Sequence, residues 1–286
     1  MGYKMYMLII AYFFSNLTFC QIYGTVRDGA NGNAIPYVNV WLKNKLIGAT
    51  TGSDGKFTIE KAKIGDTLHI SCLGYSTMEM PANKENIIVL KPEIHELDEV
   101  VVIPMDNTKE SSIISFEKIK KNRNWYNNGH YSLARFYDYI EDCQKTPFLG
   151  QISLITLNAK KEDVVFRIRL VEVGPNGEPS QKGLTENLIL KSKNGINEIT
   201  VDLKKEKILF PKNGFFVIVD RLNLNENKSF NRTSKIEILQ PAIGMERKEQ
   251  EKNTWFGYGG RWIPPLEMKN FLGSNGNIAV NIKLTN

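Results

Sequence analysis

The sequence predicts an all-β protein built from two sandwich units, and three observations support this fold class. Short runs of alternating apolar and polar residues recur over residues 21–103 and again from Pro147 onward. Clusters of Gly, Pro, Asn and Asp separate these runs. Apolar residues make up 42% of the 286 residues, which is enough to give each of two ordinary domains a core. Closely spaced short strands of this kind are typical of antiparallel sandwiches.

Residues 1–20 differ in composition from the rest of the chain. Lys4 precedes an apolar stretch over residues 5–14 that is too short to cross a bilayer comfortably, and polar residues follow it. This order is typical of a secretory signal peptide. We expect cleavage after Cys20 and export of the mature protein to the periplasm, the outer-membrane surface or the extracellular space.

Cys20 also permits a second interpretation, in which it carries a lipid. The segment ends in LTFC, but Phe19 occupies a position that normally holds a small residue in a lipoprotein. A predicted strand also begins at Ile22, so no flexible tether separates it from Cys20. We therefore expect membrane association only if Cys20 is lipidated.

Residues 21–104 are predicted to form the first sandwich. Turn-forming clusters such as GANGNAIP and KIGD lie between its strand-like runs. In chain order these runs are IYGTVRD (22–28), YVNVWLK (37–43), LIGATT (46–51), KFTIE (56–60), TLHISC (67–72), NIIVL (86–90) and LDEVVVI (97–103).

The stretch GATTGSDGKFTI, residues 48–59, fits either a ligand-binding loop or a turn. Asp54-Gly55 lies between two alternating runs, and this dipeptide is a strong β-hairpin signal. A calcium loop would place oxygen ligands at alternate positions, and a phosphate loop would open a helix. Asp54 is the one carboxylate near the turn, and KFTIE is strand-like. We therefore predict a hairpin turn at Asp54 and Gly55.

Residues 105–146 are predicted to be a connector with short helices. Ile113, Ile114, Phe116 and Ile119 recur at a spacing closer to that of a helix than of a strand. The following run YSLARFYDYIEDC fits a short helix or a strand. Strand-like runs then return over residues 147–286, with an Asn-Gly hairpin signal at 194–195, and predict a second, jelly-roll-like sandwich.

The charges argue against a nucleic-acid partner. Lys and Arg number 37 against 31 Asp and Glu, and the excess is spread along the chain. Nucleic-acid binding usually needs basic residues gathered on one face. Two cysteines, Cys72 and Cys143, follow the predicted signal peptide. Export permits a disulfide between them, but Cys72 alternates with Leu68 and Ile70 on one strand face, so we favour two unpaired thiols.

Six stretches of the first unit occur in a recognisable order: GTVRD, AIPYVNVWLK, GATTGSDGKFTI, GDTLHISCLGYS, IIVLKP and LDEVVV. With them, residues 21–104 resemble the carboxypeptidase-regulatory-like family, a transthyretin-like Greek-key sandwich. The resemblance implies a module found in secreted metallocarboxypeptidases and at the N-terminus of TonB-dependent outer-membrane transporters of Gram-negative bacteria. Residues 103–286 are too few for a transporter's plug and barrel. The second unit looks like the C-terminal part of small secreted proteins with the same first module, which implies no activity.

The resemblance makes a zinc site worth seeking, but the histidines do not fit one. A zinc peptidase needs three protein ligands and a general base. His69 is followed three residues later by Cys72, and His95 by Asp98, while His130 stands alone. The Gly-x-Ser-x-Gly motif of serine hydrolases is also absent from the sequence. We therefore expect no metal, no cofactor and no catalytic residues, with an uncharacterised hydrolase as the alternative.

An aromatic cluster near the C-terminus provides the candidate contact residues Trp255, Tyr258 and Trp262. Aromatic side chains at a sandwich edge can stack on sugars or anchor a protein partner. The alternative is that both tryptophans fill the core of the second unit, which the turn at Gly259-Gly260 favours. We expect a non-enzymatic binding or scaffold protein of the envelope whose partner is an envelope protein or a glycan. A carbohydrate-binding protein that uses these three residues is the alternative.

Overall fold

The computed structural model describes residues 21–93, 104–114, 116, 125–126, 129–231, 236–246, 253–265, 267 and 277–286. The predicted signal peptide, Cys20, His95 and Ile119 lie outside these residues. The described part is nearly all β, which confirms the predicted fold class. It contains no helix long and apolar enough to cross a membrane.

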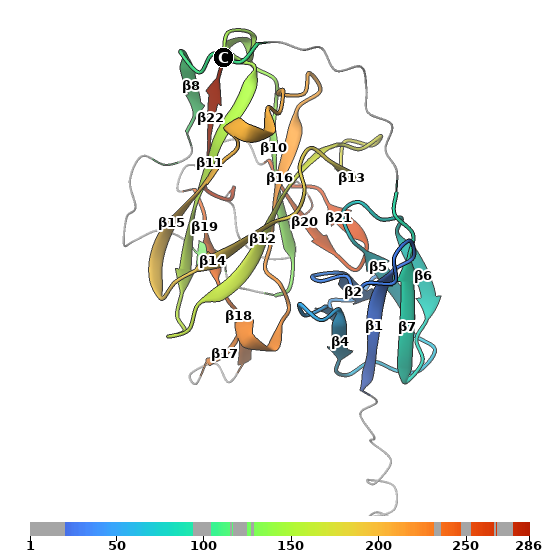
Figure 1. Cartoon of the computed structure of the whole chain (residues 1–286). Coiled ribbons are helices and arrows are strands. Elements are labelled where there is room, and N and C mark those ends of the chain that lie inside the picture. Colours follow the sequence, from blue (N-terminus) through green and yellow to red (C-terminus); the bar gives the residue numbers. More distant parts are fainter. Residues whose placement is uncertain are drawn as a thin grey trace, which may run out of the picture.

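The first unit is a sandwich of two small sheets (Figure 1). One sheet has the order β4-β1-β7, with β1 and β7 parallel. The other has the order β3-β2-β5-β6. The strands are β1 (Ile22–Asp28), β2 (Asn39–Leu42), β3 (Gly48–Thr50), β4 (Lys56–Ile59), β5 (Thr67–Ser71), β6 (Met78–Pro81) and β7 (Glu85–Leu90).

The core of the first unit lies between these two sheets. Val26 and Ile88 from one sheet and Val40 and Ile70 from the other belong to one buried cluster. Exposed and buried residues alternate strictly along β7, as expected for a strand with one face on a core. Because β2 and β5 also alternate, their remaining side chains point to the opposite side, toward the second unit.

The turn at Asp54 and Gly55 is present, but it is not a hairpin. Gly55 has a φ of 72°, its N–H donates to Gly52 O (3.0 Å), and Asp54 Oδ1 accepts from Lys56 N (3.0 Å). However, β3 pairs with β2 whereas β4 pairs with β1, so the turn carries the chain from one sheet to the other. Turn chemistry specifies a local chain reversal and leaves the choice of partner strand to the packing of the core.

Thr51, next to this turn, adds side-chain hydrogen bonds to those that its backbone makes with Tyr37 and Val38. Its buried Oγ1 accepts from Val38 N (2.8 Å) and donates to Ile35 O (2.9 Å). We expect Thr51→Val to lower the free energy of unfolding by roughly 1–3 kcal/mol, because the shape is kept while both bonds are lost. Denaturant unfolding measures this. Thr58→Val, at an exposed position of β4, is the matched control, and an equal effect there would contradict the explanation.

The second unit also consists of two sheets. One has the order β13-β12-β16-β10-β20-β21, with β14 also pairing with β12. Its strands are β10 (Ser132–Tyr137), β12 (Val164–Val173), β13 (Pro179–Gly183), β14 (Leu188–Ser192), β16 (Phe215–Asp220), β20 (Thr254–Tyr258) and β21 (Arg261–Ile263).

The other sheet has the order β8-β22-β11-β19-β9, with β15 also pairing with β11. Its strands are β8 (Glu110–Ile113), β9 (Trp125–Tyr126), β11 (Phe148–Asn158), β15 (Gly195–Asp202), β19 (Ala242–Gly244) and β22 (Val280–Thr285). The remaining elements are the ribbon β17 (Lys228–Asn231) and β18 (Ile236–Leu239) and the 3-10 helices η1 (Glu141–Gln144), η2 (Lys204–Glu206) and η3 (Asn225–Asn227).

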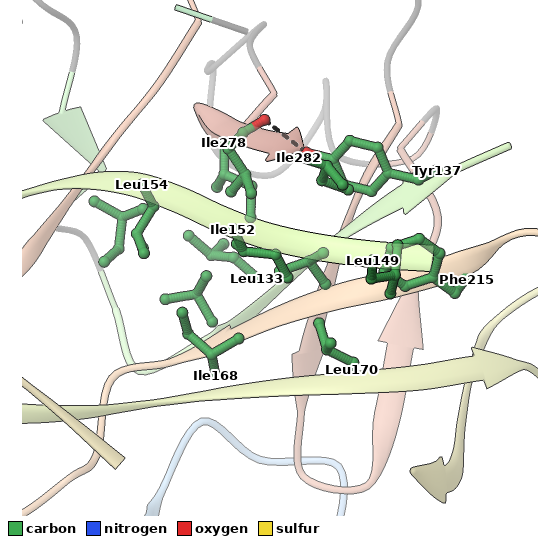
Figure 2. Close-up of a cluster of buried hydrophobic side chains, with 14 of the residues drawn as sticks. Leu133, Tyr137, Leu149, Ile152, Leu154, Ile168, Leu170, Phe215, Ile278 and Ile282 are labelled. Atoms are coloured by element: carbon green, nitrogen blue, oxygen red, sulfur yellow. Dashed lines mark hydrogen bonds between the residues drawn. The ribbon is translucent and has the colours of Figure 1, made fainter. Parts of the chain in front are cut away.

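A large apolar core joins the two sheets of the second unit. In Figure 2, Leu133 and Ile168 from one sheet and Ile152 and Ile282 from the other lie in the same cluster, and all four are fully buried. Within the segment 193–195, the predicted Asn-Gly hairpin is again a crossing between sheets, since β14 pairs with β12 and β15 with β11.

The segment 105–146 contributes more strand than the predicted connector. Ile113, expected in a helix, lies in β8, which pairs with β22. Strand β10 lies between β16 and β20, and η1 is the one helical turn among the described residues of this segment. β10 is buried at several consecutive positions because both faces of its sheet are covered, so the alternation that marks a strand is weak.

Cys72 and Cys143 are free, as predicted, and both are buried. Each belongs to the core of a different unit. Burial raises the pKa of both thiols.

A candidate binding cleft between the two units

One wall of the cleft is the outer face of β2 and β5 in the first unit. Along β2, Val40 points to the core, so Asn39 and Trp41 point to the second unit. The pairing of the two strands places Ser71 beside Asn39 and His69 beside Trp41. This wall therefore has aromatic and hydrogen-bonding side chains where an ordinary sheet-to-sheet contact would have apolar ones.

The opposite wall is the outer face of the sheet that contains β12, β16, β10, β20 and β21. Ser132 on β10 pairs with Gly257 on β20, and Gly257 pairs with Trp262 on β21. Trp255, two residues before Gly257, projects from the same face. The Trp262 ring therefore lies close over Gly257, and a side chain at Gly257 would collide with it, since a Cβ there would lie 2.6 Å from the ring.

The two walls leave a cleft of about 600 Å³. Figure 1 shows β20 and β21 beside β2 and β5, where the units meet. The loop between β12 and β13 closes one side of the cleft with Asn176 and Glu178, and Gln181 follows on β13. The volume lies within the ~300–1,000 Å³ typical of small-ligand sites.

All three aromatic residues selected from the sequence, Trp255, Tyr258 and Trp262, line this cleft. Each is partly buried, because one side packs on the protein while another faces the cleft. Trp255 meets Phe216 edge to face, with ring centroids 6.0 Å apart. The indole rings of Trp255 and Trp262 therefore have a supported orientation on the outer face of the sheet, whereas Tyr258 packs against the core between the sheets.

Trp41 is a fourth aromatic residue of the cleft, and the sequence reasoning missed it. Its ring lies against Gly48 on the neighbouring strand, where a Cβ would approach it to 2.5 Å. The signal was present, because the alternation of YVNVWLK puts Trp41 on the face opposite Val38 and Val40. What the alternation does not show is that this face is covered by a second unit.

A buried ionic group lies beside the cleft, on β12 and β16. Asp220 accepts from Arg169 Nε (2.7 Å), Arg169 Nη2 (3.0 Å) and Arg167 Nε (2.8 Å). Burial by itself would raise the pKa of Asp220, but the guanidiniums of Arg169 and Arg167 outweigh it and hold the pKa far below its usual value. Burial also lowers the pKa of Arg167.

The same ionic group connects the units, because Arg167 Nη1 donates to Tyr37 O in the first unit (2.7 Å). The sequence contains a signal for it. Arg167 and Arg169 alternate within the apolar run FRIRL, and Asp220 ends the apolar run FFVIVD. Apolar runs of this kind are expected to be buried, and a charged side chain that is buried with them needs a partner of opposite charge.

His69 takes part in a second polar group at the cleft. Its Nδ1 lies 3.3 Å from Glu79 Oε1, and Lys43 Nζ lies 2.7 Å from Glu79 Oε2. Hydrogen bonds from Lys43, and then from His69, lower the pKa of Glu79. His130 lies elsewhere, and burial lowers its pKa. Over the described part of the chain, no three His, Cys, Asp or Glu side chains are grouped as a metal site requires.

Two sets of backbone contacts hold the walls in place. At one end, Asn44 N donates to Gly259 O (3.2 Å) at the tip of the β20–β21 hairpin. At the other, Asn223 Nδ2 donates to Gly48 O (2.6 Å), and Thr50 N donates to Asn223 O (3.3 Å). The cleft is therefore bounded by hydrogen-bonded contacts between the units.

Comparison with known proteins identifies the first unit. Residues 22–102 match the family model described as CarboxypepD_reg-like domain. The first unit is a CarboxypepD_reg-like domain. It supplies the wall that contains Trp41, His69 and Ser71, whereas the wall with Trp255 and Trp262 lies beyond the matched residues.

Three curated relatives match the part of the chain that includes the CarboxypepD_reg-like domain. TonB-dependent receptor SusC of Bacteroides thetaiotaomicron is 34% identical over 110 residues, which are 37% of this chain and 11% of the receptor. A TonB-dependent receptor of Formosa agariphila is 35% identical over 96 residues, 33% of this chain and 9% of the receptor. The chain thus matches only a small part of the length of these receptors.

Among solved structures, the crystal structure of a DUF3823 family protein from Parabacteroides merdae is 10% identical to this chain. The alignment covers 71% of this chain and 98% of that protein, with a TM-score of 0.20.

Proposed function

We propose that this is an exported, non-enzymatic binding protein of the cell envelope, and that its ligand occupies the cleft between the units. The cleft itself is the observation that supports this function. Two sheets that met only for stability would bury apolar faces against each other. Here the facing walls present Trp41, Trp262 and polar groups and enclose about 600 Å³.

The envelope location is supported by the relatives, which are TonB-dependent receptors. In this proposal the mature protein begins at Gln21, residues 21–104 and 147–286 form the two units, and residues 105–146 add strands to the second. Scaffolding of an envelope assembly would follow from the same binding.

The state of the titratable groups favours binding over catalysis. A general acid or base works best with a pKa near the working pH. The pKa values of Asp220 and Glu79 are instead lowered by cationic partners. A nucleophilic cysteine needs a lowered pKa, whereas burial raises those of Cys72 and Cys143.

A pull-down of immobilised mature protein from envelope extracts tests the function. We expect the protein to retain an envelope component, Trp41→Ala to lose it, and Trp125→Ala to keep it. Trp125 is the control because it is a partly buried tryptophan of the opposite sheet, where it packs against Phe116 and Ile155. Retention that survives Trp41→Ala would contradict the cleft as the site. Conversion of the retained component into smaller products, lost in Trp41→Ala, would identify an enzyme.

A further inference from the structure

The chemistry of the cleft walls indicates what kind of ligand they accept, and this inference rests on the proposed function. Aromatic rings come from both walls, with Trp41 on one and Trp255 and Trp262 on the other. Three of the four tryptophans of the chain thus border one cavity. Flat apolar surfaces of this kind bind ligands that themselves have an apolar face.

Between the rings, the walls carry uncharged hydrogen-bonding groups. Asn39 and Ser71 lie side by side on the first wall, and Ser132 lies on the second. Asn176, in the loop between β12 and β13, and Gln181, on β13, add amides. Hydroxyls and amides both donate and accept, so they suit a ligand with many groups that do the same.

Among the charged groups that line the cleft, Arg169 is paired with an opposite charge inside the protein. Arg169 binds the Asp220 carboxylate through two nitrogens. Glu178 accepts from Asn176 N (3.0 Å), and the Arg261 guanidinium lies 6.0 Å from the centre of the Tyr258 ring. An anionic ligand would have to compete with Asp220 for the guanidinium of Arg169.

We propose that the cleft binds a neutral oligosaccharide. A sugar ring has an apolar face that stacks on indole and a rim of hydroxyls that donate and accept. Those are the two features that the walls complement, and a neutral sugar leaves the Arg169–Asp220 pair undisturbed. Trp262, supported by Gly257, is the main stacking surface.

The first experiment classifies the component retained from envelope extract in the pull-down. We expect retention to survive proteinase treatment of the extract and to disappear after periodate oxidation, which cleaves vicinal diols. The retained component should also pass through an anion exchanger. If retention is lost after proteinase treatment and survives periodate, the ligand is not an oligosaccharide. The proposed binding function would still stand. If the component binds to the anion exchanger, it carries negative charge, and this would contradict a neutral ligand.

The second experiment titrates the mature protein with neutral oligosaccharides of increasing length, prepared from the periodate-sensitive material, and follows tryptophan fluorescence. Trp262→Ala should weaken binding by about tenfold or more, as expected for a central aromatic contact. Trp262→Phe, which keeps a stacking ring, should restore most of the affinity and guards against a folding defect. Trp125→Phe should leave binding unchanged.

Salt dependence provides an independent readout. Because the proposed ligand has no charge, its affinity should change little between low salt and about 0.5 M NaCl. A steep loss of affinity with salt would indicate an anionic ligand and overturn the proposal. Equal affinities of Trp262→Ala and the unaltered protein would also overturn it. If no component is retained through the cleft at all, the proposed function fails as well.

Discussion

Asp220→Asn is expected to lower the free energy of unfolding by about 3–5 kcal/mol, the cost of breaking a buried ion pair by removing one partner. Asp220 is 3% exposed, and its carboxylate binds both Arg167 and Arg169, which are 1% and 5% exposed. Asparagine has nearly the same shape but leaves two buried guanidiniums without their counter-charge. Denaturant unfolding of the mature protein measures the loss.

Asp163→Asn is the control for this substitution. Asp163 is exposed in the loop before β12, so the same chemical change is made where water solvates the side chain. We expect its effect to be within about 0.5 kcal/mol of zero. Equal losses for the two variants would show that the buried group does not stabilise the fold.

The contribution of Asp220 should also depend on pH. Its pKa is lower in the folded protein than the unfolded value of 3.8, so the folded state favours the ionised form. The stability that this supplies is fully present above the unfolded pKa and is lost as pH falls below it, toward the folded pKa. The difference in unfolding free energy between the unaltered protein and Asp220→Asn should therefore be constant above about pH 5 and shrink below pH ~4. A difference that does not change down to pH ~3 would contradict this.

Gly260→Ala is expected to destabilise the protein by roughly 2–5 kcal/mol, through backbone strain and overpacking together. Gly260 has a φ of 85°, and a Cβ there would lie 2.5 Å from Cε1 of His69. His69 is held by Glu79, so either the imidazole must leave that contact or the β20–β21 hairpin must move away from the first unit. Because Trp262 lies on this hairpin, its fluorescence should shift to longer wavelength as water reaches it.

Gly195→Ala separates the two causes. Gly195 has a φ of 89°, close to that of Gly260, but no atom lies within 4 Å of a Cβ built there. Gly195→Ala should therefore lose only the stability that the backbone strain costs, about 1–2 kcal/mol, and its tryptophan fluorescence should not shift. If the two alanine variants lose the same stability, the contact between Gly260 and His69 does not hold the units together.

Local sequence patterns were sufficient to predict much of the first unit. Alternation in β7 and β4 predicted strands with one buried face, and the family resemblance over residues 21–104 is confirmed by the matched family model. Gly55 adopts the positive φ that the Asp-Gly signal requires. The partner strands around it were predicted wrongly, because pairing depends on the core, which a turn signal does not encode.

Less of the site could be predicted. Trp255, Tyr258 and Trp262 were selected as contact residues, but their partners across the cleft, Trp41 and His69, were not. The two groups are far apart in the chain, and no periodicity relates one to the other. The sequence left open whether the segment that forms β10 is a helix or a strand, and the reason there is different. Burial on both faces removes the alternation that identifies a strand.

The β-rich class, the positions of the turns, the unpaired thiols and the family of the first unit could all be predicted from the amino-acid sequence. Each of these depends on backbone preferences and on alternation along a few neighbouring residues. Three other features became known from the folded structure: the outer faces of two sheets meet, Arg167 and Arg169 share Asp220, and a cleft remains between Trp41 and Trp262. These features come from contacts between distant segments, and such contacts depend on how whole sheets pack.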